Sequence, residues 1–205
     1  MDSRETILSS IRKHLAASVP NDEPPQTVVP VVAPTPTVTS LVALFRDNVE
    51  AVNGHCIVAR NEAEVRQAVT QILTVHGARR IAISDAPALN GLIGEIAPGA
   101  KEIFEFDVGI TTAQAAIAET GTLLLDSARE RHRLASLVPP VHIAIVNASS
   151  IFQTLAEALA FIRKDGDISP AVTFITGPSR TADIELTLAI GVHGPQELYV
   201  IINGA

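Results

Sequence analysis

Aliphatic runs with the length of strands alternate with segments that have the spacing of amphipathic helices, and this alternation strongly restricts the possible folds. Strands are expected at 55–59, 80–84, within 103–110, and at 122–126, 142–146, 171–175 and 198–202. Helices are expected near 40–52, from 61, at 112–118, from 150 and near 182–189. Repeated strand–helix alternation favours a largely parallel sheet with helices on both faces. The sequence therefore predicts a three-layer α/β/α domain with a mostly parallel sheet.

Length and composition agree with this prediction. Apolar residues make up 47% of the 205 residues, whereas aromatic residues make up only 3% and tryptophan is absent. The core must therefore be built from Ala, Val, Ile and Leu, which suits a buried parallel sheet. Domains typically contain about 100–200 residues, so we expect one domain with an appendage. Two polar pairs predict helix starts, namely Asn61 with Glu64 and Ser150 with Gln153.

The appendage is a predicted helix within residues 1–18. Ser3 can cap this helix, and Leu8, Ile11 and Leu15 form a narrow apolar stripe along it. The stripe can pack back on the domain, form a homodimer by swapping onto a second copy of the chain, or dock on another protein.

A proline-rich linker is predicted between the helix and the domain. Residues 19–39 contain prolines at 20, 24, 25, 30, 34 and 36, a composition typical of an extended, semi-rigid segment. The predicted α/β domain then occupies residues 40–205.

Charge and cysteine content exclude several classes of protein. The formal net charge is −7 and no basic stripe is visible, so we do not expect a nucleic-acid binder. The single cysteine, Cys56, permits neither an intrachain disulfide nor an all-cysteine cluster, so no cofactor is expected to bind through the chain's own cysteines. No apolar run approaches the roughly 18 residues of a membrane span, and the N-terminus lacks the pattern of a signal peptide. We therefore expect a cytoplasmic protein.

One candidate site segment surrounds Gly121, which is expected at a helix-to-strand junction. Glu119 can act there as a general base or nucleophile, and the hydroxyls of Thr120 and Thr122 can orient a substrate. The alternative is a solvated glutamate before a turn glycine, with Thr122 starting the strand. The residues alone do not decide between the two interpretations.

A second candidate segment follows the strand expected at 171–175. Gly177 permits a positive φ, and a helix is expected to begin near Ser179. Its free backbone N–H groups, together with Arg180 and Thr181, can hold a phosphate or carboxylate. The alternative is that Ser179 or Thr181 only caps the helix.

Histidines supply the remaining candidates. His193 lies in a glycine-rich loop, where it can face a cleft, and it is predicted to be catalytic together with Glu119. His142 is interpreted as a core histidine whose hydrogen bonds are satisfied. His132, His142 and His193 show no paired ligand spacing, so no metal site is predicted.

These segments resemble those of a known family. The runs AAIAETGTL (115–123), PVHI (140–143), TGPSRTADIE (176–185) and GVHGP (191–195) are similar to the lactate utilization protein C family, also called the LUD domain, over a region that extends from about residue 41 to the C-terminus. The resemblance implies a three-layer fold similar to sugar-phosphate isomerases, coenzyme A transferases and formyltetrahydrofolate cyclo-ligases. It also implies a role in oxidising L-lactate to pyruvate beside two other proteins, at least one of which carries iron–sulfur clusters.

Two hypotheses about function follow. In the first, the chain is an accessory or ligand-binding component of an L-lactate oxidation system; it binds a small anionic metabolite and docks on iron–sulfur proteins. In the second, the chain is an enzyme on its own and binds a phosphorylated, acyl or folate-type metabolite at Gly177–Thr181, with Glu119 as base or nucleophile. Fold alone does not decide between them.

Overall fold

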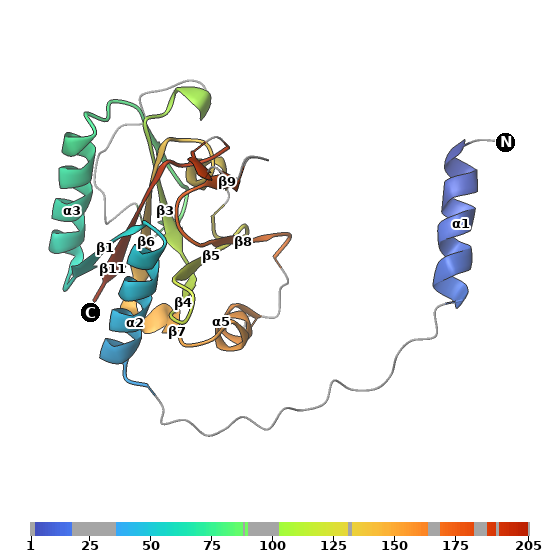
Figure 1. Cartoon of the computed structure of the whole chain (residues 1–205), viewed down its shortest axis with the longest axis horizontal. Coiled ribbons are helices and arrows are strands. Elements are labelled where there is room, and N and C mark those ends of the chain that lie inside the picture. Colours follow the sequence, from blue (N-terminus) through green and yellow to red (C-terminus); the bar gives the residue numbers. More distant parts are fainter. Residues whose placement is uncertain are drawn as a thin grey trace. The chain divides into compact units, whose positions relative to one another are not determined.

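The computed structural model describes residues 3–17, 36–87, 89, 103–130, 133–163, 169–182, 188–191 and 193–204. The chain divides into two compact units, residues 1–35 and residues 36–205 (Figure 1). The first unit contains helix α1 (Ser3–Ala17), as the apolar stripe predicts. Residue 18 of the predicted helix segment and residues 19–35 of the predicted linker lie outside the described residues. No helix in the described ranges is both long enough and apolar enough to span a membrane.

The second unit is built around a parallel sheet of five strands in the order β1-β11-β6-β3-β2. These strands are β1 (His55–Ala59), β2 (Ile81–Ile83), β3 (Val108–Ala113), β6 (Val141–Asn147) and β11 (Glu197–Asn203). Each neighbouring pair is parallel, and Ile143 in the middle strand lies opposite Tyr199 on one side and Ile110 on the other. The predicted α/β fold with a parallel central sheet is therefore confirmed.

Alternation along the strands divides the core between the two faces of this sheet. Ile143 and Ile145 of β6 pack in the cluster that includes α3 (Glu62–Val75), whereas Ala144 and Val146 pack in the cluster that includes α2 (Val38–Ala51). Figure 1 shows α2 and α3 beside the sheet. Because successive strand residues point to opposite faces, one aliphatic strand fills both cores.

Local sequence explains where both helices begin. Asn61 accepts a hydrogen bond from the Glu64 backbone N–H at 3.0 Å, which confirms the predicted start of α3. Thr37 plays the same part for α2 and accepts a bond from the Ser40 N–H at 3.2 Å. Both caps satisfy backbone donors that the first helical turn leaves unpaired.

A second sheet, which the sequence does not predict, lies on the α2 side. It has the order β7-β4-β5-β8, with β4 (Ala115–Ile117), β5 (Thr122–Asp126), β7 (Ile151–Phe152) and β8 (Val172–Ile175). The predicted helix at 112–118 is wrong, because its residues form the end of β3 and all of β4. Alanine-rich residues favour a helix, but here pairing with β5 and β7 overrides that preference.

The helix that covers the other face of this sheet begins later than expected. α5 (Leu155–Ile162) has Thr154 as its N-cap, and Thr154 and Glu157 form a reciprocal capping box. The predicted Ser150–Gln153 box is therefore wrong. Both four-residue patterns fit the capping rule, and the short strand β7 occupies the region that the first pattern assigns to the helix.

The segment after β8 also differs from the prediction. Residues 180–182 and 188–190 form strands β9 (Arg180–Ala182) and β10 (Leu188–Ile190), which pair antiparallel. The predicted helix near 182–189 is therefore wrong at both ends, and residues 183–187 lie outside the described residues. Residues 88 and 90–102 lie outside them as well.

Candidate functional site

The turn that contains Glu119 connects two antiparallel strands, β4 and β5, and is not the expected helix-to-strand junction. Gly121 has φ +62° and is buried against α2, where a Cβ would lie 2.7 Å from the backbone of Asn48 and Val49. Asn48 Nδ2 donates a hydrogen bond of 2.8 Å to the Ala118 carbonyl. The turn is therefore fixed by its contacts with α2. The side chain of Glu119 is exposed to solvent.

Three threonine hydroxyls connect the two predicted site segments. Thr122 Oγ1 lies 2.7 Å from Thr120 Oγ1 and 2.7 Å from Thr176 Oγ1. Thr120 and Thr122 belong to the first segment and Thr176 to the second, so the structure brings the segments together although 54 positions separate the last pair. A chain of hydroxyl groups can donate and accept at either end.

The Gly177 loop also packs against the end of α2. Gly177 has φ +82°, as the sequence predicts for a sharp turn, and a Cβ there would lie 2.9 Å from the Val52 carbonyl oxygen. Arg180 donates a hydrogen bond from its guanidinium to the same carbonyl, which belongs to the C-cap residue of α2. Arg180 therefore has a structural role as a cap of α2. This bond does not use all five N–H donors of the guanidinium group.

The helix expected to begin near Ser179 is not formed over the described residues 179–182, because Arg180 and Thr181 lie in β9. The expected source of free backbone N–H groups for an anion is therefore absent over residues 179–182. Ser179 instead donates its N–H to the Pro195 carbonyl at 2.9 Å, and its carbonyl accepts the Gly191 N–H at 2.9 Å. Binding of an anion by the side chains of Ser179, Arg180 and Thr181 stays a prediction.

A small cavity of about 200 Å³ lies beside the Gly177 loop. Its wall includes three predicted site residues, Gly177, Ser179 and His193, together with Thr176 and His142. His193 is exposed. The structure thus brings the second segment and the histidine loop together at one hollow.

His142 differs from its predicted role. It is fully buried, as a core histidine should be. Its Nε2 pairs with Thr111 Oγ1 at 2.8 Å, but its Nδ1 has no hydrogen-bond partner among the residues that the structure describes. Leaving such a group unpaired costs about 1–3 kcal/mol. Burial lowers the pKa of His142 to about 3, so the ring is neutral near pH 7.

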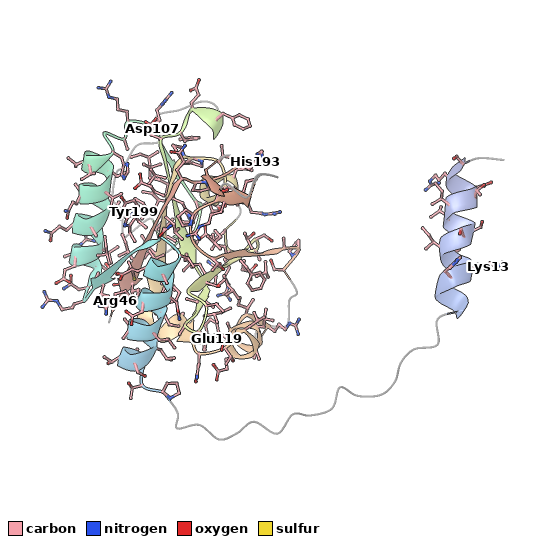
Figure 2. The ribbon with its side chains drawn as sticks, in the orientation of Figure 1. Lys13, Arg46, Asp107, Glu119, His193 and Tyr199 are labelled. Atoms are coloured by element: carbon pink, nitrogen blue, oxygen red, sulfur yellow. The ribbon has the colours of Figure 1, made fainter. Side chains whose placement is uncertain are left out.

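The predicted catalytic pair is not assembled. Glu119 does not line the cavity that His193 lines, and its backbone N–H bonds to the Gln153 carbonyl at 3.2 Å near the start of α5. Figure 2 shows Glu119 toward α5 and His193 toward β9, well separated within the domain. A role for both residues in one reaction would require a substrate that spans this separation or a change in conformation.

A larger cleft of about 690 Å³ lies at the carboxyl ends of three parallel strands, where α/β proteins commonly bind ligands. Asp85 follows β2, Thr112 and Gln114 are at the end of β3, and Asn147 ends β6. Further lining residues are Ala86, Pro87, Ala113, Ala128, Arg129, Ile145, Ser150 and Phe161. The sequence does not indicate this site, because its strands are separated by long stretches of chain and Arg129 lies in a run of mixed charge.

A buried carboxyl group stands behind this cleft. Glu130 is 2% exposed, and its Oε1 accepts bonds from the backbone N–H of Thr112 at 2.8 Å and from the Thr112 hydroxyl. Gln114 extends the network, since its amide donates to Thr112 Oγ1 at 3.1 Å and accepts the Asp126 N–H at 2.6 Å. Glu130 Oε2 has no hydrogen-bond partner within the described ranges, and burial raises the pKa of this carboxyl group. The network fixes the positions of the Thr112 and Gln114 side chains on the cleft wall.

Neither the single cysteine nor a cluster of metal ligands provides a further reactive site within the described residues. Burial raises the pKa of Cys56 to about 12, so the thiol is protonated and a poor nucleophile near neutral pH. Within the described ranges, no three His, Cys, Asp or Glu side chains are grouped so that they could hold a metal ion.

Comparison with known proteins identifies relatives of this chain. Lactate utilization protein C of Bacillus licheniformis is 40% identical over 102 residues, which cover 47% of this chain and 42% of that protein. Lactate utilization protein C of a Geobacillus strain is 31% identical over 166 residues, which cover 68% of this chain and 69% of that protein. The matched region thus spans about two fifths of the first relative and about two thirds of the second.

A solved structure supports the same grouping. The crystal structure of a DUF162 family protein from Deinococcus radiodurans matches with a TM-score of 0.61 and 26% identity, covering 82% of this chain and 99% of that chain. The family model described as the LUD domain matches residues 42–203. The resemblance inferred from the motifs is confirmed, and the chain belongs to the LUD domain family.

Proposed function

We propose that this protein takes part in lactate utilization as a ligand-binding component of an L-lactate oxidation system. The observation that carries the proposal is the similarity to relatives named lactate utilization protein C, which reaches 31% identity over 69% of one of them. We place the protein in the cytoplasm, where lactate and pyruvate are metabolised.

Electron transfer is assigned to other proteins in this proposal. Oxidising a 2-hydroxy acid to a 2-oxo acid removes two electrons and two protons, so an electron acceptor is required. With Cys56 as its single cysteine, the chain cannot ligate an iron–sulfur cluster through four thiolates. Partner proteins that carry iron–sulfur clusters would then accept the electrons.

The cleft at the carboxyl ends of the strands is the proposed site for the small acid. Arg129 supplies a guanidinium group, which suits a carboxylate, and Asn147 and Ser150 supply neutral donors. Asp85 supplies an acceptor for the substrate hydroxyl. These groups together complement a 2-hydroxy carboxylate, and the Glu130 network supports the wall on which Thr112 and Gln114 lie.

Calorimetric titration of the full chain with L-lactate and with pyruvate tests this proposal. We expect binding by the wild-type protein and a loss of affinity of about tenfold or more in Arg129→Ala, because the carboxylate loses its cation. Arg66→Ala is the matched control, since Arg66 is an exposed arginine on α3, away from the cleft residues. It should bind as the wild type does.

Arg180→Ala separates this site from the predicted anion site at the Gly177 loop. If Arg180→Ala loses affinity and Arg129→Ala does not, the acid binds at the loop and the assignment to the cleft is wrong. If the wild-type protein binds neither acid at millimolar concentration, the ligand-binding proposal itself fails.

A further inference from the structure

The wall of the cleft at the carboxyl ends of the strands is in contact with a carboxyl group that solvent does not reach. Glu130 is 2% exposed, and its Oε1 accepts hydrogen bonds from the backbone N–H and the hydroxyl of Thr112, which lines the cleft. Arg129, the residue before Glu130, lines the cleft as well. A charge held in the cleft therefore acts on the Glu130 carboxyl group through the protein rather than through water.

This carboxyl group is poorly placed to keep a negative charge. Its Oε2 has less than 1 Å² of accessible surface and no hydrogen-bond partner in the described part of the chain. A carboxylate oxygen that meets neither water nor a donor is costly, because burial removes its hydration. Burial is the largest cause of the raised pKa of Glu130, and hydrogen bonds from Ser84, Thr112 and Gln114 oppose it.

Three other charged side chains lie near Glu130 among the described residues. Asp85 follows Ser84 and lines the cleft, Arg129 precedes Glu130, and the carbonyl of Asp126 accepts the Glu130 backbone N–H at 2.8 Å. No histidine is among the described residues that line the cleft. Asp85 and Glu130 are therefore the two carboxyl groups that a ligand in the cleft can affect most, and an experiment must distinguish them.

A carboxylate bound in the cleft adds a second negative charge beside Glu130. Like charges separated by protein repel more strongly than in water, because solvent screening between them is weak. A nearby negative charge raises the pKa of a carboxyl group, so the bound acid and a proton on Glu130 favour each other. L-lactate is ionised above about pH 5 and does not itself take up this proton.

We propose that the cleft binds a small monocarboxylate together with one proton, and that Glu130 takes up this proton. The inference rests on the proposed function and adds how the same site responds to pH. No bond of the acid breaks: the anion enters the cleft, a proton from the medium neutralises the Glu130 carboxylate, and both leave together. Affinity for the acid therefore rises as the pH falls.

Calorimetric titration of the full chain with L-lactate, in phosphate and in Tris buffer, tests this coupling without any substitution. The two buffers differ in their heat of ionisation, so the difference in binding heat counts the protons taken up. We expect net proton uptake between pH 5 and pH 8. The dissociation constant should rise about tenfold across this range, since a pKa shift of about one unit changes the affinity tenfold.

Two variants assign the proton to a residue. Glu130→Gln keeps an oxygen for the Thr112 N–H and should bind L-lactate equally well at pH 5 and pH 8, without proton uptake. Asp85→Asn removes the other carboxyl group of the cleft and should retain the uptake. Uptake that persists in Glu130→Gln, or that disappears in Asp85→Asn, would overturn the assignment.

The wild-type titration separates this inference from the proposed function. Binding of L-lactate with no proton uptake and with the same affinity from pH 5 to pH 8 would overturn the coupling and leave the proposed function intact. No binding at any pH in this range would overturn both.

Discussion

At the scale of the residue, close contacts with α2 and its C-cap explain why the two predicted site segments need glycine at positions 121 and 177. Gly121 and Gly177 both have positive φ. A Cβ added at either position would lie less than 3 Å from the backbone of α2 or from its C-cap residue. The positive φ of Gly177 agrees with what the sequence predicts for a glycine at this turn. The partner is not predictable, because Val52 is far away along the chain.

Substitution of Gly121 tests this packing. Gly121→Ala should lower the free energy of unfolding by about 3 kcal/mol, because the strained φ of +62° combines with a contact of 2.7 Å to the α2 backbone. Gly77→Ala is the matched control: φ is +57° and no atom lies within 4 Å of the added Cβ. The control should cost only about 1 kcal/mol. Urea unfolding measures both, and equal losses would show that the contact with α2 is unimportant.

Glu130 gives a prediction about pH at the same scale. Its pKa is raised by burial in the folded state, so the folded protein holds the proton more tightly than the unfolded chain does. The stability from this group is therefore complete below the ordinary glutamate pKa of about 4.3 and is lost as pH rises through the raised value.

Glu130→Gln removes that titration while it keeps an oxygen for the Thr112 N–H. Relative to wild type, the variant should gain stability between pH 4 and pH 7, as measured by urea unfolding at each pH. A constant difference between Glu130→Gln and wild type across this range would contradict the account.

At the scale of the element, the sequence predicts long, strongly patterned elements well. β1 and α3 occur where apolar spacing and the Asn61 cap place them. The wrong predictions concern segments whose local sequence suits a helix and a strand equally well, so that pairing with distant strands decides which one forms. β4 is an Ala-Ala-Ile segment that would suit a helix, and it is a strand because β5 and β7 lie beside it.

The start of α5 provides the prediction at this scale. Thr154→Ala should cost about 1 kcal/mol of stability, because it removes the side chain that caps the Glu157 N–H. Ser150→Ala removes the other candidate cap and should cost much less, since α5 begins four residues later. Thermal unfolding of the two variants measures the difference. A larger loss in Ser150→Ala would mean that the helix starts where the sequence pattern first placed it.

At the scale of the whole molecule, the fold separates two hollows along the parallel sheet. The large cleft lies where β2, β3 and β6 end, whereas the small cavity includes His142 and Leu198, each the second residue of its strand. The sequence draws attention to the small cavity through glycines and a histidine. It does not reveal the cleft, because its residues come from distant strand ends and carry no shared motif.

The division into two units gives a prediction about truncation. Every buried hydrophobic residue of the described core lies at or after Val42, so removal of residues 1–35 should leave a folded unit. Circular dichroism and a cooperative unfolding transition measure this. Removal of residues 1–51, which also deletes α2, is the control and should abolish cooperative unfolding, because Phe45 and Val49 are fully buried. An unfolded 36–205 chain would contradict the division.

Growth of the source organism on L-lactate tests the central claim most directly. A strain that lacks this gene should fail to grow with L-lactate as the sole carbon source but should grow normally on pyruvate, the product of the proposed pathway. The wild-type gene should restore growth on L-lactate, and the Arg129→Ala gene should restore it poorly. Equal growth of the deletion strain and its parent on L-lactate, with no other gene of this family present, would contradict a role in lactate utilization.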